Sequence, residues 1–297
     1  MKKASFLLVV MAFCFIQLSA QRSYTITRPD GVKLYIHEYC TGKPVVLLGG
    51  GPGLNPNYLV PLCQKVAGYR FIIPDQRGAG QSKIDNVDSL NMSVSKYVED
   101  LEALRVHLKL PQLILGGHSW GGMLAFAYAA RYPANVERLI LLGSGGITPY
   151  FFRYFDSNIT MRLHPEDREE ADNAHGTAAY LRGIWPGYFF SRERALATKH
   201  LLDSTLANGN QSDIYTLTIR NFEATTAART RGIRKYKNPV IIIQGRQDPI
   251  GESTVYETRE TLPQAKFTFI EECGHFPWLE SEKAATEFYR LLKAALS

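Results

Sequence analysis

The chain has 297 residues, of which 45% are hydrophobic, 21% charged and 11% aromatic, and these values are typical of globular proteins. Disordered and fibrous classes are therefore excluded. Lys and Arg number 34 against 28 Asp and Glu, a formal net charge of +6, but the basic residues form no run that would follow a phosphate backbone. We expect no nucleic-acid partner.

The amino terminus differs from this composition. Two lysines precede an apolar stretch at 6–18, and Leu18-Ser19-Ala20 resembles the cleavage site of a signal peptide. The stretch is shorter than the roughly 18 residues that a membrane-spanning helix needs. We therefore expect a signal peptide at 1–20, an exported protein that is periplasmic or secreted, and no stable membrane insertion after cleavage. An uncleaved anchor and a lipid on Cys14 are the alternatives.

Without the signal peptide three cysteines are left, Cys40, Cys63 and Cys273, and an odd number excludes a complete disulfide framework. Export would permit one bridge, for which Cys40 and Cys63 are the candidates, but buried free thiols are the default expectation for a domain of this size. No Cys and His residues have the spacing of zinc ligands. The sequence implies no metal and no organic cofactor.

The predicted elements begin with a hairpin, because 24–27 and 32–39 alternate around the turn residues 29–31. Short apolar runs, typical of strands buried on both faces, then follow at 45–48, 71–73, 113–115, 139–142 and 240–243, with a weaker one at 267–270. Helical spacing is found at 94–108 and 288–292. This alternation predicts the α/β class, with a mostly parallel sheet wrapped by helices and a ligand beyond the carboxyl ends of the strands.

The block at 146–232 interrupts the alternation. It contains Trp185, many Tyr and Phe residues and mixed charge, but no clear strand. We expect a helical cap insertion over the functional edge of the sheet. The catalytic domain would then consist of 21–145 and 233–297.

The most informative motif is Gly117-His118-Ser119-Trp120-Gly121, which follows the predicted strand at 113–115 and precedes a helical run. A G-x-S-x-G sequence in this setting predicts a nucleophile elbow, a sharp turn that holds the serine hydroxyl out. Its glycines avoid Cβ atoms where strand and helix crowd together. We expect the ring of His118 to point away from Ser119 and to serve packing.

A serine hydroxyl is a weak nucleophile and needs a base, which a third group must orient. Asp248 follows the predicted strand at 240–243, and His275 follows the last one. The chain order of Ser119, Asp248 and His275 is that of α/β-hydrolases. These residues are the predicted catalytic triad.

Acyl transfer also needs N–H donors directed at the developing oxyanion. The backbone N–H of Trp120, directly after Ser119, is one candidate. The other should come from the loop Gly49-Gly50-Gly51-Pro52-Gly53, in which Pro52 has no N–H. This loop lacks the Gly-Lys-Ser/Thr ending of a phosphate-binding loop.

Four segments together resemble the proline iminopeptidase branch of the α/β-hydrolase superfamily, namely 50–53, 75–82, 116–122 and 273–278. The resemblance implies an α/β-hydrolase fold with a helical cap. It further implies Ser119 as nucleophile, Asp248 as orienting acid, His275 as base, and Gly51 beside Trp120 in the oxyanion hole. The turn at 75–82 is chiefly structural in such proteins, and we assign it no chemistry.

Two positions depart from the family pattern. Gly49 stands where the family commonly has a histidine that braces the loop, so we expect a looser loop. The family also holds the free amine of its substrate with cap glutamates, one of them beside a Trp-x-x-Trp-Glu motif. The matching stretch here is Trp185-Pro186-Gly187-Tyr188-Phe189, with Phe189 in the position of the acid. Trp185, Tyr188 and Glu223 are the candidate substrate-binding residues, although an exposed acid on a helical cap is commonly only solvated.

The sequence therefore predicts a serine hydrolase that acts through an acyl-enzyme on a small peptide or a small-molecule acyl substrate. Release of an N-terminal proline or small apolar residue is the favoured reaction. Cleavage of an ester or another uncharged acyl compound is the alternative, since an aromatic cap without amine-binding acids would suit such a substrate. A non-catalytic binding protein on a hydrolase scaffold is the remote alternative.

Overall fold

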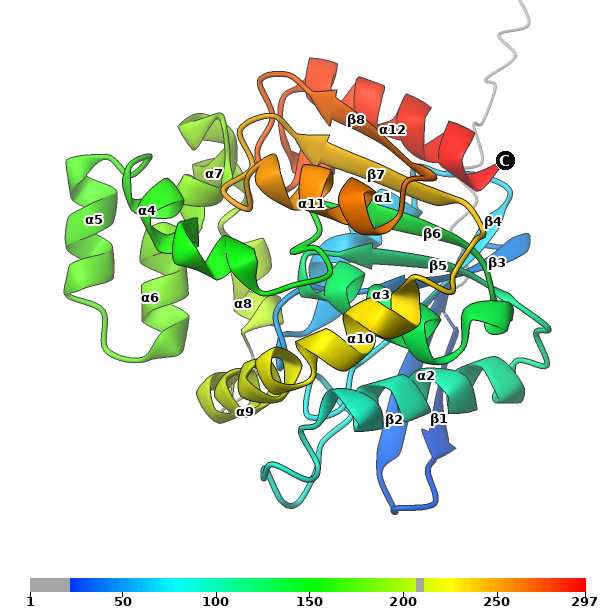
Figure 1. Ribbon diagram of the computed structural model, residues 1–297. Coiled ribbons are helices and arrows are strands. Elements are labelled where there is room, and N and C mark those ends of the chain that lie inside the picture. Colours follow the sequence, from blue (N-terminus) through cyan, green and yellow to red (C-terminus); the bar gives the residue numbers. More distant parts are fainter. Residues whose placement is uncertain (1–21, 207–210) are drawn as a thin grey trace, which may run out of the picture.

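The computed structural model describes residues 22–206 and 211–297, so the predicted signal peptide at 1–20 lies outside the described residues. Its centre is one eight-stranded sheet with the order β1-β2-β4-β3-β5-β6-β7-β8 (Figure 1). The strands are β1 (Arg22–Thr27), β2 (Lys33–Tyr39), β3 (Lys43–Leu48), β4 (Tyr69–Pro74), β5 (Leu113–His118), β6 (Val136–Leu142), β7 (Val240–Gly245) and β8 (Ala265–Ile270). Only β2 pairs antiparallel with its neighbours, β1 and β4, and the other pairs are parallel. The predicted mostly parallel sheet is confirmed.

Each predicted apolar run lies inside a strand. β3 to β7 are mostly buried on both faces because helices cover them, whereas the edge strand β8 is partly exposed. Successive side chains of a strand point to opposite faces. Val46 and Leu115 therefore belong to one hydrophobic core, whereas Val45 and Ile114 belong to the other. Five helices accompany the sheet: α1 (Val60–Cys63), α2 (Val94–His107), α3 (Trp120–Arg131), α11 (Ser253–Thr261) and α12 (Glu282–Leu296). Figure 1 shows α2 and α3 on one face and α12 on the other.

Between β6 and β7 the described residues form helices and turns but no strand. The helices are α4 (Phe155–Thr160), α5 (Pro165–Asp172), α6 (Thr177–Ile184), α7 (Arg192–Thr198), α8 (Leu201–Thr205), α9 (Gln211–Ala224) and α10 (Thr226–Ile233). α4 to α7 lie beyond one end of the sheet (Figure 1), where Ile159, Ala171 and Ile184 form a small separate core. Phe222 of α9 and Ile233 of α10 instead join the main core. Within the predicted cap range of 146–232, one part therefore has its own small core, whereas another part packs into the main core of the sheet domain.

Five short 3₁₀ helices complete the described elements: η1 (Pro56–Leu59), η2 (Pro133–Asn135), η3 (Tyr150–Arg153), η4 (Trp185–Tyr188) and η5 (Pro277–Leu279). Two of them carry residues of the candidate site: η1 contains Tyr58 and η4 contains Tyr188.

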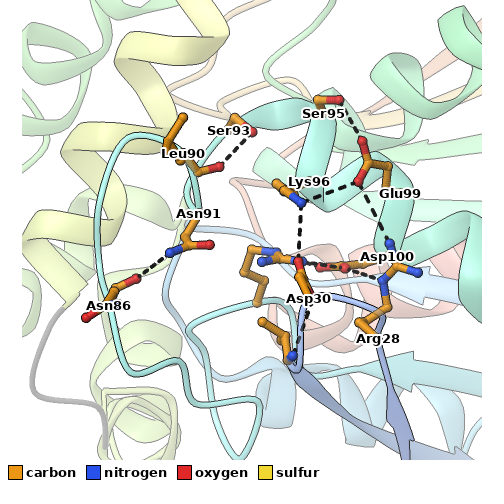
Figure 2. A network of polar contacts seen from close by, with 12 residues as sticks. Arg28, Asp30, Asn86, Leu90, Asn91, Ser93, Ser95, Lys96, Glu99 and Asp100 are labelled. Carbon is orange, nitrogen blue, oxygen red and sulfur yellow. Dashed lines mark hydrogen bonds and ion pairs between the residues drawn. The ribbon is translucent and has the colours of Figure 1, made fainter.

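A polar network fixes the turn at 75–82 to the sheet domain. Arg77 is fully buried and forms ion pairs with Asp100 of α2 at 2.7 Å and with Asp30 at 3.1 Å. Arg28 also pairs with Asp100, at 3.0 Å, and Lys96 with Asp30, at 3.4 Å. Figure 2 shows Arg28, Asp30, Lys96 and Asp100 grouped where the first hairpin meets α2. The turn that carries Gln76 is thereby held by charged side chains.

Candidate active site

Ser119 stands at the junction of β5 and α3 in a strained conformation. Its φ is 56° and its ψ is −121°, a region that residues other than glycine rarely adopt. The Ser119 N–H donates to the carbonyl of Leu142 at the end of β6 (3.0 Å), and the Ser119 carbonyl accepts from the N–H of Gly122 (3.0 Å). Ser119 is half-buried between the buried residues His118 and Trp120. This is the elbow geometry that the motif predicts.

The glycines of the motif allow the close packing of strand and helix. A Cβ on Gly117 would collide with the backbone of Gly121, and a Cβ on Gly121 would collide with the carbonyl of Leu48. Because these neighbours are backbone atoms of packed elements, no rotamer change can relieve the collision.

Asp248 and His275 form a buried hydrogen-bonded pair beyond the ends of β7 and β8. His275 Nδ1 lies 3.0 Å from Asp248 Oδ1 and 2.9 Å from Oδ2, and each residue is 2% exposed. The Ile250 N–H also donates to Asp248, at 2.9 Å. The carboxylate accepts the proton of Nδ1, which leaves Nε2 of His275 as the acceptor that a general base needs.

The pair lies at the same edge of the sheet as Ser119. Gly143 follows Leu142, the partner of the Ser119 N–H, and a Cβ on Gly143 would lie 2.7 Å from Asp248 Oδ2 and 3.0 Å from His275 Nδ1. In the described part of the chain the Ser119 hydroxyl makes no hydrogen bond. Contact between the Ser119 hydroxyl and His275 therefore stays a prediction, and such bonds commonly tighten only when substrate binds.

The loop after β3 lies against Ser119 and contains an N–H, that of Gly51, without a partner in the described part of the chain. A Cβ on Gly50 would lie 2.8 Å from Cβ of Ser119, so this loop contacts the elbow. The Gly50 N–H already donates to the hydroxyl of Tyr58 (2.5 Å), and Pro52 has no N–H. The Gly51 N–H makes no hydrogen bond among the described residues, and neither does the Trp120 N–H, at the first position of α3. Both predicted oxyanion donors are therefore available.

Gln76 links Trp120 to the glycine-rich loop, two residues before Gly51. Its Nε2 donates to the carbonyl of Gly49 (2.8 Å), and its Oε1 accepts from the indole N–H of Trp120 (2.9 Å). Gln76 is 7% exposed. Together with the bond from Gly50 to Tyr58, this contact braces the loop that we expected to be looser. The loop is thus held by side chains from two other segments, and a loop looser than that of the family stays a prediction.

His118 connects the glycine-rich loop, the elbow and His275. Its Nε2 lies 3.0 Å from the carbonyl of His275, and its Nδ1 lies 2.8 Å from the hydroxyl of Tyr58. A carbonyl only accepts, so Nε2 carries the proton and Nδ1 accepts from Tyr58, whose oxygen accepts from the Gly50 N–H. Burial, with the nearby His275, holds the pKa of His118 well below its usual value, which agrees with a neutral ring. The role of His118 therefore exceeds the packing that we expected.

A second set of bonds ties the loop of His275 to the cap. The His275 N–H donates to the carbonyl of Tyr188 at 2.7 Å. Glu280, which is 2% exposed, accepts from the N–H groups of Gly274 (2.9 Å), Phe190 (2.7 Å) and Ser191 (3.4 Å). Burial raises the pKa of Glu280, while these N–H groups oppose the rise. Sequence reasoning missed Glu280, whose only sequence signal is its position shortly after His275.

The structure separates the three candidate substrate-binding residues. Tyr188 is half-buried, and its ring centroid lies 5.4 Å from that of His275. Trp185 is 4% exposed, donates its indole N–H to the carbonyl of Ala195 (3.0 Å) and packs in the core. Glu223 is exposed on α9. Of the three, Tyr188 lies beside His275, while Trp185 is buried in the core and Glu223 is exposed. Contact of each with substrate stays a prediction.

The remaining observations concern thiols, metals and membranes. Cys40, Cys63 and Cys273 are free thiols, and Cys40 Sγ lies 3.6 Å from the carbonyl of Cys63. Within 22–206 and 211–297, no three His, Cys, Asp or Glu residues group so as to hold a metal ion. No helix in those ranges has the length and apolar character needed to cross a membrane.

Comparison with known proteins identifies the family. A family model described as alpha/beta hydrolase fold matches residues 43–282. The chain belongs to the alpha/beta hydrolase fold family. The predicted fold is confirmed, and so is the predicted similarity to proline iminopeptidases, since this α/β-hydrolase is 29% identical to a proline iminopeptidase of Lactobacillus helveticus over 266 residues. That alignment covers 80% of the chain and 85% of the relative.

Other similar proteins carry different names. The α/β-hydrolase is 24% identical over 286 residues to Lipase 3 of a Moraxella species, and the match covers 93% of the chain and 85% of the lipase. An esterase structure from Exiguobacterium antarcticum superposes with a TM-score of 0.72 at 21% identity, over 93% of the chain and all of the esterase. The comparisons thus support hydrolase activity in general.

Proposed function

We propose that this α/β-hydrolase is a serine hydrolase that forms an acyl-enzyme on Ser119. The observation that carries the proposal is the buried pair of Asp248 and His275 at the edge of the sheet that holds the strained Ser119. His275 Nε2 would accept the proton of the serine hydroxyl as Oγ attacks the substrate carbonyl. The N–H groups of Gly51 and Trp120 would stabilise the oxyanion.

Collapse of the tetrahedral intermediate would transfer the proton from His275 to the leaving group. Water activated by the same ring would then release the acid from Ser119. Asp248 would keep the ring oriented and stabilise its charged form.

The favoured reaction is release of an N-terminal proline or small apolar residue. The proline iminopeptidase relative and the four shared motifs support this substrate. The half-buried ring of Tyr188 beside His275 would contact a small apolar side chain.

Ester cleavage is the second candidate, and Phe189 is the observation that favours it. Phe189 stands where the family resemblance places an amine-binding acid, and it is 3% exposed. The similarity to Lipase 3 points the same way. Proline naphthylamide and a short-chain 4-nitrophenyl ester, assayed side by side, would separate the two reactions. A higher kcat/KM on the amide supports the aminopeptidase, and hydrolysis of the ester alone contradicts it.

We further propose that the protein is exported, on the basis of the leader-like sequence at 1–20. The mass of the chain recovered from the exported fraction tests this. A chain that begins near Gln21 is expected, whereas an intact amino terminus in the cytoplasmic fraction would contradict export.

A further inference from the structure

One positive charge of the cap lies beside the candidate active site without a partner. The guanidinium of Arg162 makes no hydrogen bond and no ion pair in the described part of the chain, and its Nη1 is buried. The residue as a whole is half-buried, so part of it is accessible to a solute. An N–H group that is removed from water and left unpaired is costly, and buried polar groups in native proteins are nearly always bonded.

Contacts of α4, which ends two residues before Arg162, hold this part of the cap against the loop of Asp248 and against the segment of Tyr188. Asn158 Nδ2 donates to the carbonyl of Pro249 (3.0 Å), the residue after Asp248. Ile159 packs against Gly187 so closely that a Cβ there would lie 2.8 Å from Ile159. Gly187 precedes Tyr188, whose ring lies beside His275. Arg162 follows this helix by two residues, and its backbone N–H donates to the carbonyl of Ile159 at 3.0 Å.

Neighbouring carboxylates do not use the donors of Arg162. Asp248 and Glu280 are within electrostatic reach of the guanidinium, and they oppose the lowering of the Arg162 pKa that burial causes. Neither acid lies within ion-pair distance of Arg162. The Asp248 oxygens accept from His275 and Ile250, and the Glu280 oxygens accept from three backbone N–H groups.

We infer that Arg162 is a subsite for a carboxylate of the substrate, which its planar fork would bind through two N–H groups. This inference rests on the proposed acyl-transfer site at Ser119 and narrows its substrate class. Peptides with a free carboxylate close to the scissile bond, such as dipeptides, would be preferred over their amides. Half-esters of dicarboxylic acids are the corresponding class for ester cleavage.

Binding without turnover tests the inference. In a Ser119→Ala background, calorimetry measures the affinities of two ligand pairs, in each of which a free carboxylate is replaced by a carboxamide. The first pair is prolyl-glycine and prolyl-glycinamide. The second is the 4-nitrophenyl half-ester of succinate and the same ester with its free carboxylate converted to a carboxamide. We expect the carboxylate member to bind about 10-fold or more tightly, the size of one charge-assisted interaction. When Arg162→Gln is combined with Ser119→Ala, the two affinities of a pair should differ by no more than about twofold. Arg153 is an exposed cap arginine on η3, and the control substitution Arg153→Gln should leave the preference for the carboxylate unchanged. Arg162→Lys keeps the charge and should retain part of the preference.

Equal affinity for both members of both pairs would overturn the inference, and so would a preference that survives Arg162→Gln in a folded variant. A preference confined to the ester pair would support the subsite and contradict the aminopeptidase assignment. If the wild type hydrolyses proline naphthylamide but binding shows no preference for the carboxylate, the proposed function is supported and the Arg162 subsite is contradicted.

Discussion

The two walls of the candidate site are built differently. On the sheet side, buried side chains hold the backbone of each catalytic segment: Tyr58 holds Gly50, Gln76 holds Gly49, and His118 holds His275. On the cap side, the polar ends of Tyr188 and Arg162 make no hydrogen bond in the ranges described. The cap also accepts one bond from the His275 N–H, through the carbonyl of Tyr188, but within the same ranges these two side-chain ends stay unbonded. We infer that the sheet side fixes Ser119 and His275, while the cap side chains are available to select substrates. Variants on the sheet side should therefore change kcat, and variants on the cap side should change KM and specificity.

Gln76→Leu should show the largest effect on the sheet side. Removal of one direct oxyanion donor lowers kcat by about 10²–10³-fold. Gln76 acts through the residues it holds, so we expect a smaller loss in kcat of about 10–100-fold, with KM changed little. Steady-state kinetics measure this, and Gln64→Leu, an exposed position, is the control. A rise in KM at constant kcat would contradict the division between the walls.

Glu280→Gln should lower kcat by roughly 10-fold. The NH₂ group of the glutamine would face a backbone N–H that donates to the carboxylate in the wild type, and because two donors cannot bond, the loop of His275 would lose a hydrogen bond. The loop of His275 should also open more often. Cys273, a fully buried thiol next to Gly274, reports this opening through its labelling by iodoacetamide. Faster labelling of Cys273 but not of Cys63 is expected, with Glu282→Gln as control. Unchanged labelling together with normal kcat would remove Glu280 from the account.

The neutral state of His118 predicts a pH-dependent stability. The pKa of His118 is held well below its usual value in the folded protein, so protons bind the unfolded chain more strongly. His118 should therefore lower the free energy of unfolding as the pH falls below about 6.5, the pKa of a histidine in the unfolded chain. Urea unfolding of His118→Gln at several pH values should show a smaller loss of free energy of unfolding between neutral and mildly acidic pH than the wild type. An identical pH dependence would mean that His118 titrates normally.

Tyr188→Phe should have the smallest effect. The hydroxyl has no partner among the described residues, and the ring contact with His275 is kept. We expect kcat within about twofold of the wild type, a range typical of substitutions that break no bond. Tyr188→Ala removes the ring and should raise KM more than it lowers kcat. A large fall in kcat for the Phe variant would assign the hydroxyl to the chemistry.

The sheet and the candidate triad were predictable because their signals are local. Apolar runs mark strands that are buried on both faces, and Ser119, Asp248 and His275 each follow such a run. The supporting contacts were not predictable. Gln76 and Trp120 are 44 residues apart, and Glu280 reaches Phe190 across 90 residues, so no spacing rule relates them. Nor did the sequence show that Trp185 packs in the core of the protein.

The position of β4 between β2 and β3 also has no local signal, since it depends on which strand edges the connecting segments can reach. Nor does the sequence distinguish Arg162 from the other cap arginines. Its lack of a partner becomes visible only when the surroundings of every charge are known.

The central claim is that His275 activates the hydroxyl of Ser119. Labelling with a fluorophosphonate, followed by mass spectrometry of the modified peptide, tests it most directly. The account predicts one adduct, on Ser119, that is absent in Ser119→Ala and forms at least about 10²-fold more slowly in folded His275→Gln. An adduct on another residue, or labelling of Ser119 at an unchanged rate without His275, would contradict it.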